Sequence, residues 1–198
     1  GEVSHILIDR EEHGYDVMGI KKLALNGQST AQVFLSDVRV PVSNLLGQEG
    51  QGFVALMNEL PRERITIACR AFAEAQRAFE LTAEYVKERK AFGKKILEFQ
   101  NTQFTLAEMK TNLAIGWAYL DQCLHKINTG KLTPEEGAMA KLWTTETGNK
   151  LVDDCLQLFG GYGYMREYPI SRLFVDSRAR RIYGGSSEIM KLVIGRTI

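Results

Sequence analysis

The sequence predicts a mainly α-helical protein, in which a four-helix bundle follows the second half of a β-domain. Strand signals dominate residues 1–46, whereas residues 47–198 carry apolar side chains spaced by three and four positions. These two ranges are the predicted domains. The chain has 198 residues, of which 44% are hydrophobic and 25% charged, so it has the composition of a globular protein with a sizeable core.

The N-terminal range contains three short segments with strand composition, at residues 3–8, 31–35 and 38–40. Glycines, including the Asn26-Gly27 pair, separate them. So few strands do not make a stable sheet domain, and we expect the C-terminal part of a β-domain whose first strands lie outside this sequence. The chain is therefore expected to be a fragment.

Three long helices are predicted by apolar stripes. The first stripe covers residues 65–86, and the second covers 106–127, with Gly130 as its C-terminal cap. The third helix begins at Thr133, an N-cap followed by proline and two glutamates, and runs to about residue 159.

A glycine-rich turn at residues 160–164 and a short segment after Pro169 lead to a last helix near Gly185. Three long helices and a shorter one make a four-helix bundle the simplest arrangement.

Charge and cysteine content exclude several classes of protein. The 25 Lys and Arg residues against 24 Asp and Glu residues give a net charge of +1, so we expect no nucleic-acid or membrane partner. Cys69, Cys123 and Cys155 lack the spacing of a zinc site, which predicts no metal centre and a reducing compartment. The first ten residues lack the regions of a signal peptide, although a targeting segment can precede them in a longer parent.

Glu63 is a candidate general base with two interpretations. An exposed Glu63 paired with Arg62 or Arg64 is the commoner state of such a residue. Partial desolvation by Leu60 and Ile67 would instead raise its pKa and suit proton transfer near neutrality. The spacing alone leaves both open.

The other polar or glycine-rich motifs are weak signals individually. The Gly160–Gly163 run follows a helix and therefore fails the dinucleotide-binding pattern, which leaves a helix cap or a close backbone approach to a ligand. The cations of residues 89–94 can simply complement a helix dipole. The Gly184–Glu188 run is either an ordinary N-cap, with Glu188 in capping-box position relative to Gly185, or a set of free amides facing an anion or a carbonyl oxygen.

Six motifs, in order and over essentially the whole chain, resemble the acyl-CoA dehydrogenase family. They are Val38–Pro41 with Asn44–Gly47, Gly50–Phe53, Arg89–Gly93, Phe99-Gln100, Gln157–Tyr164 and Ile182–Ile189. Family members have an N-terminal helical domain, a middle β-domain and a C-terminal four-helix bundle. The resemblance implies the second half of the middle domain followed by the whole bundle.

The resemblance also implies a reaction. A carboxylate removes the α-proton of an acyl-CoA thioester while the β-hydride moves to N5 of FAD, giving a trans-2-enoyl-CoA, and electrons then pass to an electron-transfer flavoprotein. It further implies a homo-oligomer, a dimer or a tetramer, in the bacterial cytoplasm or the mitochondrial matrix. The flavin-binding strands lie outside this sequence, so the fragment is expected to be inactive alone.

The catalytic residues follow by resemblance as well. Many members place the base directly after an Ile-Tyr pair, where this chain has Gly184. Long-chain and isovaleryl types place it in a Leu-x-x-Glu-Arg sequence, which matches Leu60 to Arg64 and implies Glu63 as the base. The backbone amide of Gly184 would then donate to the thioester oxygen. Arg64 and Gly185 match substrate positions.

Ten residues match FAD positions of the family, several of which serve the neighbouring subunit's cofactor. They are Arg89, Ala91, Phe92, Phe99, Gln100, Gln157, Gly160, Gly161, Ser186 and Glu188. The competing functions are an acyl-CoA oxidase or flavin monooxygenase on the same scaffold, and a bundle that has lost catalysis and serves only for assembly.

Overall fold

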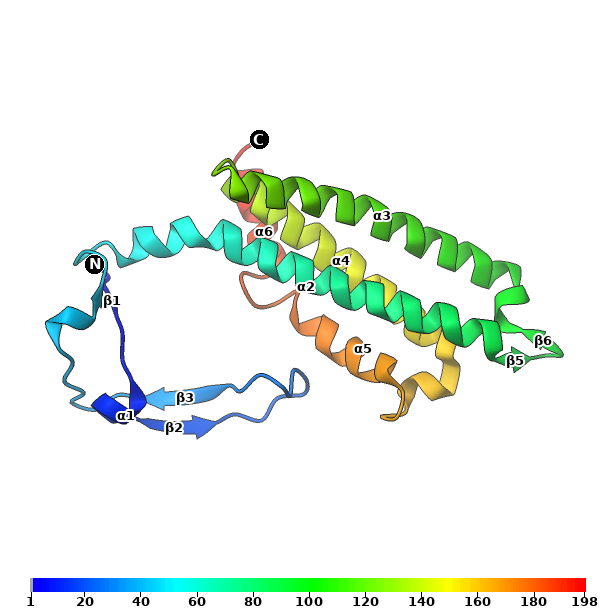
Figure 1. Cartoon of the computed structure of the whole chain (residues 1–198), viewed down its shortest axis with the longest axis horizontal. Helices are drawn as coiled ribbons and strands as arrows, with labels where there is room; N and C mark the ends of the chain where they lie inside the picture. The colour runs from blue at the N-terminus through cyan, green and yellow to red at the C-terminus, as the bar shows by residue number, and fades with distance from the viewer. Residues whose placement is uncertain (1) are drawn as a thin grey trace. The chain divides into compact units, whose positions relative to one another are not determined.

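The computed structural model describes residues 2–198 and separates into two compact units, Gly1–Glu59 and Leu60–Ile198 (Figure 1). The division lies inside helix α2 (Gly52–Glu88), beside Pro61. Proline has no N–H, so the helix lacks one hydrogen bond of its interior there. The domain boundary predicted from the sequence, between residues 46 and 47, precedes α2 and stays a prediction.

The first unit contains two antiparallel strand pairs. The strand β1 (His5–Ile6) pairs with β4 (Leu45–Leu46), and β2 (Asp16–Gly19) pairs with β3 (Ala31–Phe34). Short helical turns lie between these strands, namely α1 (Arg10–His13) and η1 (Val42–Asn44).

The structure corrects the strand predictions in two places. Residues 38–40 form no strand, because Asp37 has a φ of +51° and turns the chain out of the extended conformation just before them. The sequence analysis also missed β2, which is only four residues long and ends in Gly19. The segments at 3–8 and 31–35 do contain strands, which are shorter than predicted.

The second unit is helical and confirms the predicted fold class. It contains most of α2, then α3 (Gln100–Asn128), α4 (Pro134–Phe159), α5 (Pro169–Ala179) and α6 (Ser187–Gly195). The helices α2, α3 and α4 run side by side in Figure 1, and α3, α5 and α6 all contact α4. The segment after Pro169 is thus a helix of 11 residues, which the sequence pattern did not reveal. Within residues 2–198, no helix is both long and apolar enough to cross a bilayer.

The core of the helical unit is built around Phe72 on α2. Its side chain is 0% exposed and packs against Trp117 and Trp143, with ring centroids 6.0 and 5.5 Å away. A Cβ added at Gly116 would lie 2.0 Å from the Phe72 ring. Glycine at position 116 therefore makes room for the ring, and α2, α3, α4 and α5 share one hydrophobic cluster.

The predicted ends of two helices are confirmed. The Thr133 hydroxyl accepts a hydrogen bond from the Glu136 N–H at 3.1 Å, and the Glu136 carboxylate accepts one from the Thr133 N–H at 3.1 Å. Gly130, at a φ of +66°, ends α3 with its N–H donating to the Ile127 carbonyl. Both motifs satisfy backbone groups that a helix end leaves without intrahelical partners.

We expect Thr133→Ala to lower the free energy of unfolding by about 1 kcal/mol, because it removes one half of this capping box. Urea denaturation followed by circular dichroism measures the change. Thr111→Ala is the control, since the Thr111 hydroxyl is exposed and bonds only to a carbonyl of its own helix. Equal stability of the Thr133→Ala variant and the wild type would show that the capping box contributes nothing.

Candidate functional site

Glu63 lies on the exposed side of α2. Leu60, three residues before it, is half-buried, and Ile67, four residues after it, is buried. The Glu63 side chain itself is nevertheless exposed. Among the residues that the structure describes, Glu63 forms no ion pair with Arg62 or Arg64. The partial desolvation considered in the sequence analysis is therefore not supplied by its neighbours in this chain.

Arg64 follows Glu63 and is buried. Its side chain is 6% exposed, and in the described part of the chain its Nε atom has no hydrogen-bond partner. Burial lowers the pKa of the Arg64 guanidinium, while the nearby Glu63 carboxylate acts in the opposite direction.

The turn containing Gly184 lies against the same stretch of α2. Gly184 has a φ of +66°, and a Cβ added there would lie 2.3 Å from Cδ1 of Ile67. Ile67 is four residues after Glu63, so the two side chains project from the same face of the helix. The backbone of Gly184 thus contacts α2 one helical turn from Glu63, although the two residues are 121 positions apart in the sequence.

The N–H of Gly184 makes no hydrogen bond within residues 2–198. Its neighbour Gly185, at a φ of +92°, packs against Met190 of α6. Two consecutive residues with positive φ are most readily accommodated as glycines. The sequence motif Gly184-Gly185 thus has a conformational reason in addition to its match with the family.

Lys141 belongs to the same site, and the sequence analysis did not single it out. It projects from α4, its side chain is 0% exposed, and its Nζ donates a hydrogen bond to the carbonyl oxygen of Gly185. Burial is the main cause that lowers the pKa of Lys141, and the charge on Arg64 adds to the effect, whereas Glu63 and Glu146 oppose it. The available signal was a lysine among small residues on the buried face of a helix, next to Ala138 and Ala140.

The end of α6 nearest this site differs in one detail from the prediction. The helix begins at Ser187 with Ser186 as its N-cap, so the first of the two alternatives, an N-cap at Gly185 with Glu188 in capping-box position, does not hold. The positive φ of Gly185 is the physical reason, because an N-cap residue has an extended backbone. A hydrogen bond from Ser186 lowers the pKa of the exposed Glu188 carboxyl.

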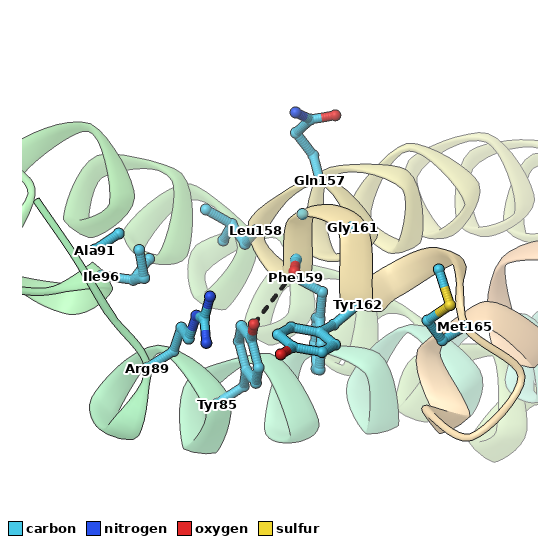
Figure 2. Close-up of a pocket in the computed structure, with 11 residues that line it drawn as sticks. Tyr85, Arg89, Ala91, Ile96, Gln157, Leu158, Phe159, Gly161, Tyr162 and Met165 are labelled. Atoms are coloured by element: carbon cyan, nitrogen blue, oxygen red, sulfur yellow. Dashed lines mark hydrogen bonds between the residues drawn. The ribbon is translucent and has the colours of Figure 1, made fainter.

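A second group of predicted residues lines an open pocket of about 660 Å³ at the other end of α2 (Figure 2). The pocket is formed by the last turn of α2, by Ala91 of β5 (Lys90–Ala91) and Ile96, which follows the paired strand β6 (Lys94–Lys95), and by the junction of α4 with η3 (Gly160–Tyr164). Five of the ten predicted flavin positions line it, namely Arg89, Ala91, Gln157, Gly160 and Gly161.

Aromatic rings fix the wall of this pocket. The Arg89 guanidinium carbon lies 5.0 Å from the centroid of the Tyr162 ring. Tyr85 stacks on Phe159 with centroids 4.2 Å apart, and its hydroxyl donates to the Phe159 carbonyl at 3.3 Å. The Gln157 amide points away from Arg89 in Figure 2. Arg89 is thus held at the pocket while its charge stays exposed to solvent.

The other predicted flavin positions lie outside the pocket lining. Phe92, at the tip of the β5–β6 hairpin, is 95% exposed, and its ring centroid is 6.4 Å from that of Phe99. Gln100 is the exposed first residue of α3. Ser186 and Glu188 lie at the start of α6, beside the Gly184 turn rather than beside Arg89.

The two groups are separated along α2. Glu63 and Tyr85 are 22 positions apart in this continuous helix. With a rise of about 1.5 Å per residue, this places them roughly 33 Å apart. Within one chain they are therefore two separate sites.

Comparison with known proteins identifies the family of this chain. The family described as "Acyl-CoA dehydrogenase, C-terminal domain" matches residues 50–198. The chain belongs to the acyl-CoA dehydrogenase family. It is 46% identical to the mitochondrial long-chain specific acyl-CoA dehydrogenase of Sus scrofa, over 99% of this chain and 46% of that protein.

Solved structures are similar over the same extent. An acyl-CoA dehydrogenase from Geobacillus kaustophilus superposes with a TM-score of 0.95 at 42% identity, covering 98% of this chain and 51% of that one. A glutaryl-CoA dehydrogenase from Mycobacterium smegmatis, solved in complex with FADH2, has a TM-score of 0.91 at 28% identity, covering 98% and 50%. The chain thus spans about half the length of the relatives it matches.

Proposed function

We propose that the full-length protein containing this chain is an FAD-dependent acyl-CoA dehydrogenase with Glu63 as its catalytic base. One observation carries the proposal. The backbone of Gly184, which by the family resemblance is the alternative position of the base, packs on Ile67, one helical turn from Glu63. A carboxylate at either position could therefore serve the same reacting carbon.

The roles of the residues follow from what the reaction requires. Glu63 accepts the α-proton of the thioester, and the Gly184 N–H donates to the thioester oxygen, where negative charge develops. The buried Arg64 follows Glu63 directly in the sequence and places a positive charge beside it. Bound FAD would supply the hydride acceptor that formation of a double bond between the α- and β-carbons requires.

The pocket at the end of α2 fits part of FAD. The exposed Arg89 offers charge-assisted hydrogen bonds to a pyrophosphate. Gly160, at a φ of +58°, and Gly161 leave the backbone without side chains beside it. The relative solved with FADH2 supports the same cofactor here.

The separation of the two sites supports a homo-oligomer, either a dimer or a tetramer. Because about 33 Å of α2 lies between Glu63 and the pocket, we infer that the pocket holds part of a neighbouring subunit's FAD. Electrons would leave through an electron-transfer flavoprotein. A location in the mitochondrial matrix or the bacterial cytoplasm accords with the mitochondrial and bacterial relatives.

A panel of acyl-CoA thioesters tests the proposed activity. Isovaleryl-CoA, long straight-chain and terpenoid-like acyl-CoAs are mixed anaerobically with the flavin-loaded full-length protein, and the flavin absorbance is followed. We expect at least one saturated thioester to bleach the flavin and to yield the 2-enoyl-CoA. If none does while dithionite still reduces the flavin, the proposed activity is wrong. Rapid reaction of the reduced, product-bound protein with oxygen would assign it to the oxidases instead.

We expect Arg89→Ala to weaken FAD binding by about 1.5 to 3 kcal/mol, the contribution of hydrogen bonds to a charged group. This corresponds to a dissociation constant raised roughly 10- to 150-fold. Flavin fluorescence after dilution and gel filtration measures the loss. Lys87→Ala is the control, since Lys87 is an exposed cation of the same helix end that does not line the pocket. Unchanged flavin retention in Arg89→Ala would contradict the assignment.

A further inference from the structure

We propose that Lys141 is a positioning residue, which fixes the Gly184-Gly185 turn over the Glu63 face of α2 through its hydrogen bond to the Gly185 carbonyl. The inference rests on the proposed function and extends it to a residue outside the motifs considered so far. Lys141 does not touch the reacting atoms in this scheme. It acts through the backbone that carries the thioester's hydrogen-bond donor.

The turn needs contacts from other elements to hold one conformation, because its two glycines can adopt many backbone conformations. Gly184 and Gly185 have φ values of +66° and +92°, and glycine loses more conformational freedom on ordering than any other residue. One backbone hydrogen bond, from the Ser187 N–H to the Arg181 carbonyl at 3.2 Å, closes the base of the turn. That bond leaves the apex unfixed.

The two ends of the turn are fixed by carboxylates on neighbouring helices. On α4, Glu146 accepts a hydrogen bond from Arg181 Nε at 2.8 Å and another from the Ser187 hydroxyl. On α2, Glu74 accepts from Arg180 Nε at 2.6 Å. These contacts flank the glycines on both sides but reach neither of them.

Lys141 is the polar side chain that reaches the apex. Its Nζ donates to the Gly185 carbonyl, and its Cε lies 3.6 Å from where a Cβ of Gly184 would be. The same lysine therefore packs beneath one glycine and hydrogen-bonds the next. Since Gly184 also rests on Ile67, the turn is held between α4 and α2.

Burial of this lysine is unfavourable for stability alone. It is 0% exposed, and it forms no ion pair among the residues that the structure describes. A buried amino group costs free energy unless it is fully paired, and an apolar side chain of similar volume is commonly tolerated at such a site. Burial also lowers the pKa of Lys141, which shows the same cost. A requirement on the turn explains why a lysine is nevertheless present.

The test compares Lys141→Met and Lys141→Gln in the flavin-loaded full-length protein. Met keeps an unbranched side chain out to Cε but removes the donor, whereas the shorter Gln retains an N–H donor without the charge. The substrate is the acyl-CoA that the wild type oxidises fastest, labelled with ¹³C at the thioester carbonyl. Infrared difference spectra measure the carbonyl band, and stopped-flow absorbance measures flavin reduction.

We expect Lys141→Met to retain flavin. The infrared band of the bound thioester carbonyl should shift toward the frequency that it has in an apolar solvent, where it accepts no hydrogen bond. Flavin reduction should slow about 10- to 100-fold, as for a small misplacement of a reacting group, with Lys141→Gln in between. Thr82→Val is the control for a lost buried hydrogen bond, because Thr82 is 0% exposed and its hydroxyl interacts with the Ala78 carbonyl and with Cys155 rather than with the turn. It should leave the carbonyl band unchanged.

The outcomes separate the two proposals. A wild-type band position and a reduction rate within about twofold of wild type in both Lys141 variants would overturn the positioning role, with the proposed function intact. Slower reduction with an unshifted band would overturn it as well. A wild type that oxidises no acyl-CoA would refute the proposed function, and this inference with it. If Lys141→Met does not fold, the carbonyl band and the rate of flavin reduction in Lys141→Gln alone test the positioning role.

Discussion

The Glu63→Gln variant of the full-length protein is expected to bind acyl-CoA while its flavin is reduced about 10² to 10⁴-fold more slowly than in the wild type. Glutamine keeps the size and the hydrogen-bonding capacity of the side chain but has no basic oxygen for the α-proton. Because Glu63 is exposed on α2, its substitution should change the free energy of unfolding by less than about 0.5 kcal/mol, so the loss of rate is not expected to come from a folding defect. Anaerobic stopped-flow absorbance of the flavin measures the rate.

Glu59→Gln is the matched control for this prediction. Glu59 is an exposed carboxylate of the same helix, one turn before Glu63. Its replacement should leave the rate of flavin reduction within about twofold of wild type, because Glu59 lies outside the Leu60–Arg64 motif that identifies Glu63 as the proposed base. If the flavin of Glu63→Gln is reduced at the wild-type rate, Glu63 is an ordinary surface carboxylate and not the catalytic base.

The structure also indicates what is needed to move the catalytic carboxylate from position 63 to position 184. Adding Gly184→Glu to Glu63→Gln places a Cβ 2.3 Å from Cδ1 of Ile67, at a φ of +66° that side chains rarely adopt. A third change, Ile67→Val, removes that methyl group at a cost of about 0.5 to 1.5 kcal/mol. We expect partial recovery of flavin reduction in the triple variant and less in the double variant.

Phe72→Ala is expected to lower the free energy of unfolding by about 3 to 5 kcal/mol. The ring is 0% exposed and packs between Trp117 and Trp143, while Gly116 gives it room without offering a side chain that could fill the cavity. Urea unfolding followed by tryptophan fluorescence measures the loss.

Phe104→Ala provides the comparison for this stability measurement. Phe104 lies on α3 and is 57% exposed, so its removal should cost less than about 1 kcal/mol. A similar small loss in Phe72→Ala would mean that the contact between α2, α3 and α4 is not the centre of the core.

Local signals predicted the helical half of the fold well. The end of α3 and the start of α4 are set by cap residues next to them in the sequence, such as Gly130 and Thr133. Such local signals can be read directly from the sequence. The strand predicted at residues 38–40 failed because Asp37 adopts a left-handed backbone that its residue type only weakly indicates. The helix α5 was missed because 11 residues hold too few apolar repeats to define a stripe.

The candidate site was predictable only in part, since its decisive contacts join distant residues. Glu63 and Gly184 were identified through motifs, but the contact of the Gly184 turn with α2 depends on the packing of Ile67 against the turn. The bond between Lys141 and Gly185 spans 44 positions, so the small residues around Lys141 could indicate its burial but not its partner. Sequence reasoning could likewise not decide the exposure of Glu63, which depends on what packs over α2.

Deuterium uptake at the α-carbon tests most directly whether Glu63 removes the α-proton. The full-length protein is incubated anaerobically in D₂O with the acyl-CoA that it oxidises fastest, and the recovered thioester is examined by mass spectrometry and NMR. A carboxyl that takes the α-proton exchanges it with solvent before returning it, so the wild type should place deuterium at the α-carbon and Glu63→Gln should place almost none. Uptake by Glu63→Gln at the wild-type rate would contradict the assignment of Glu63 as the base.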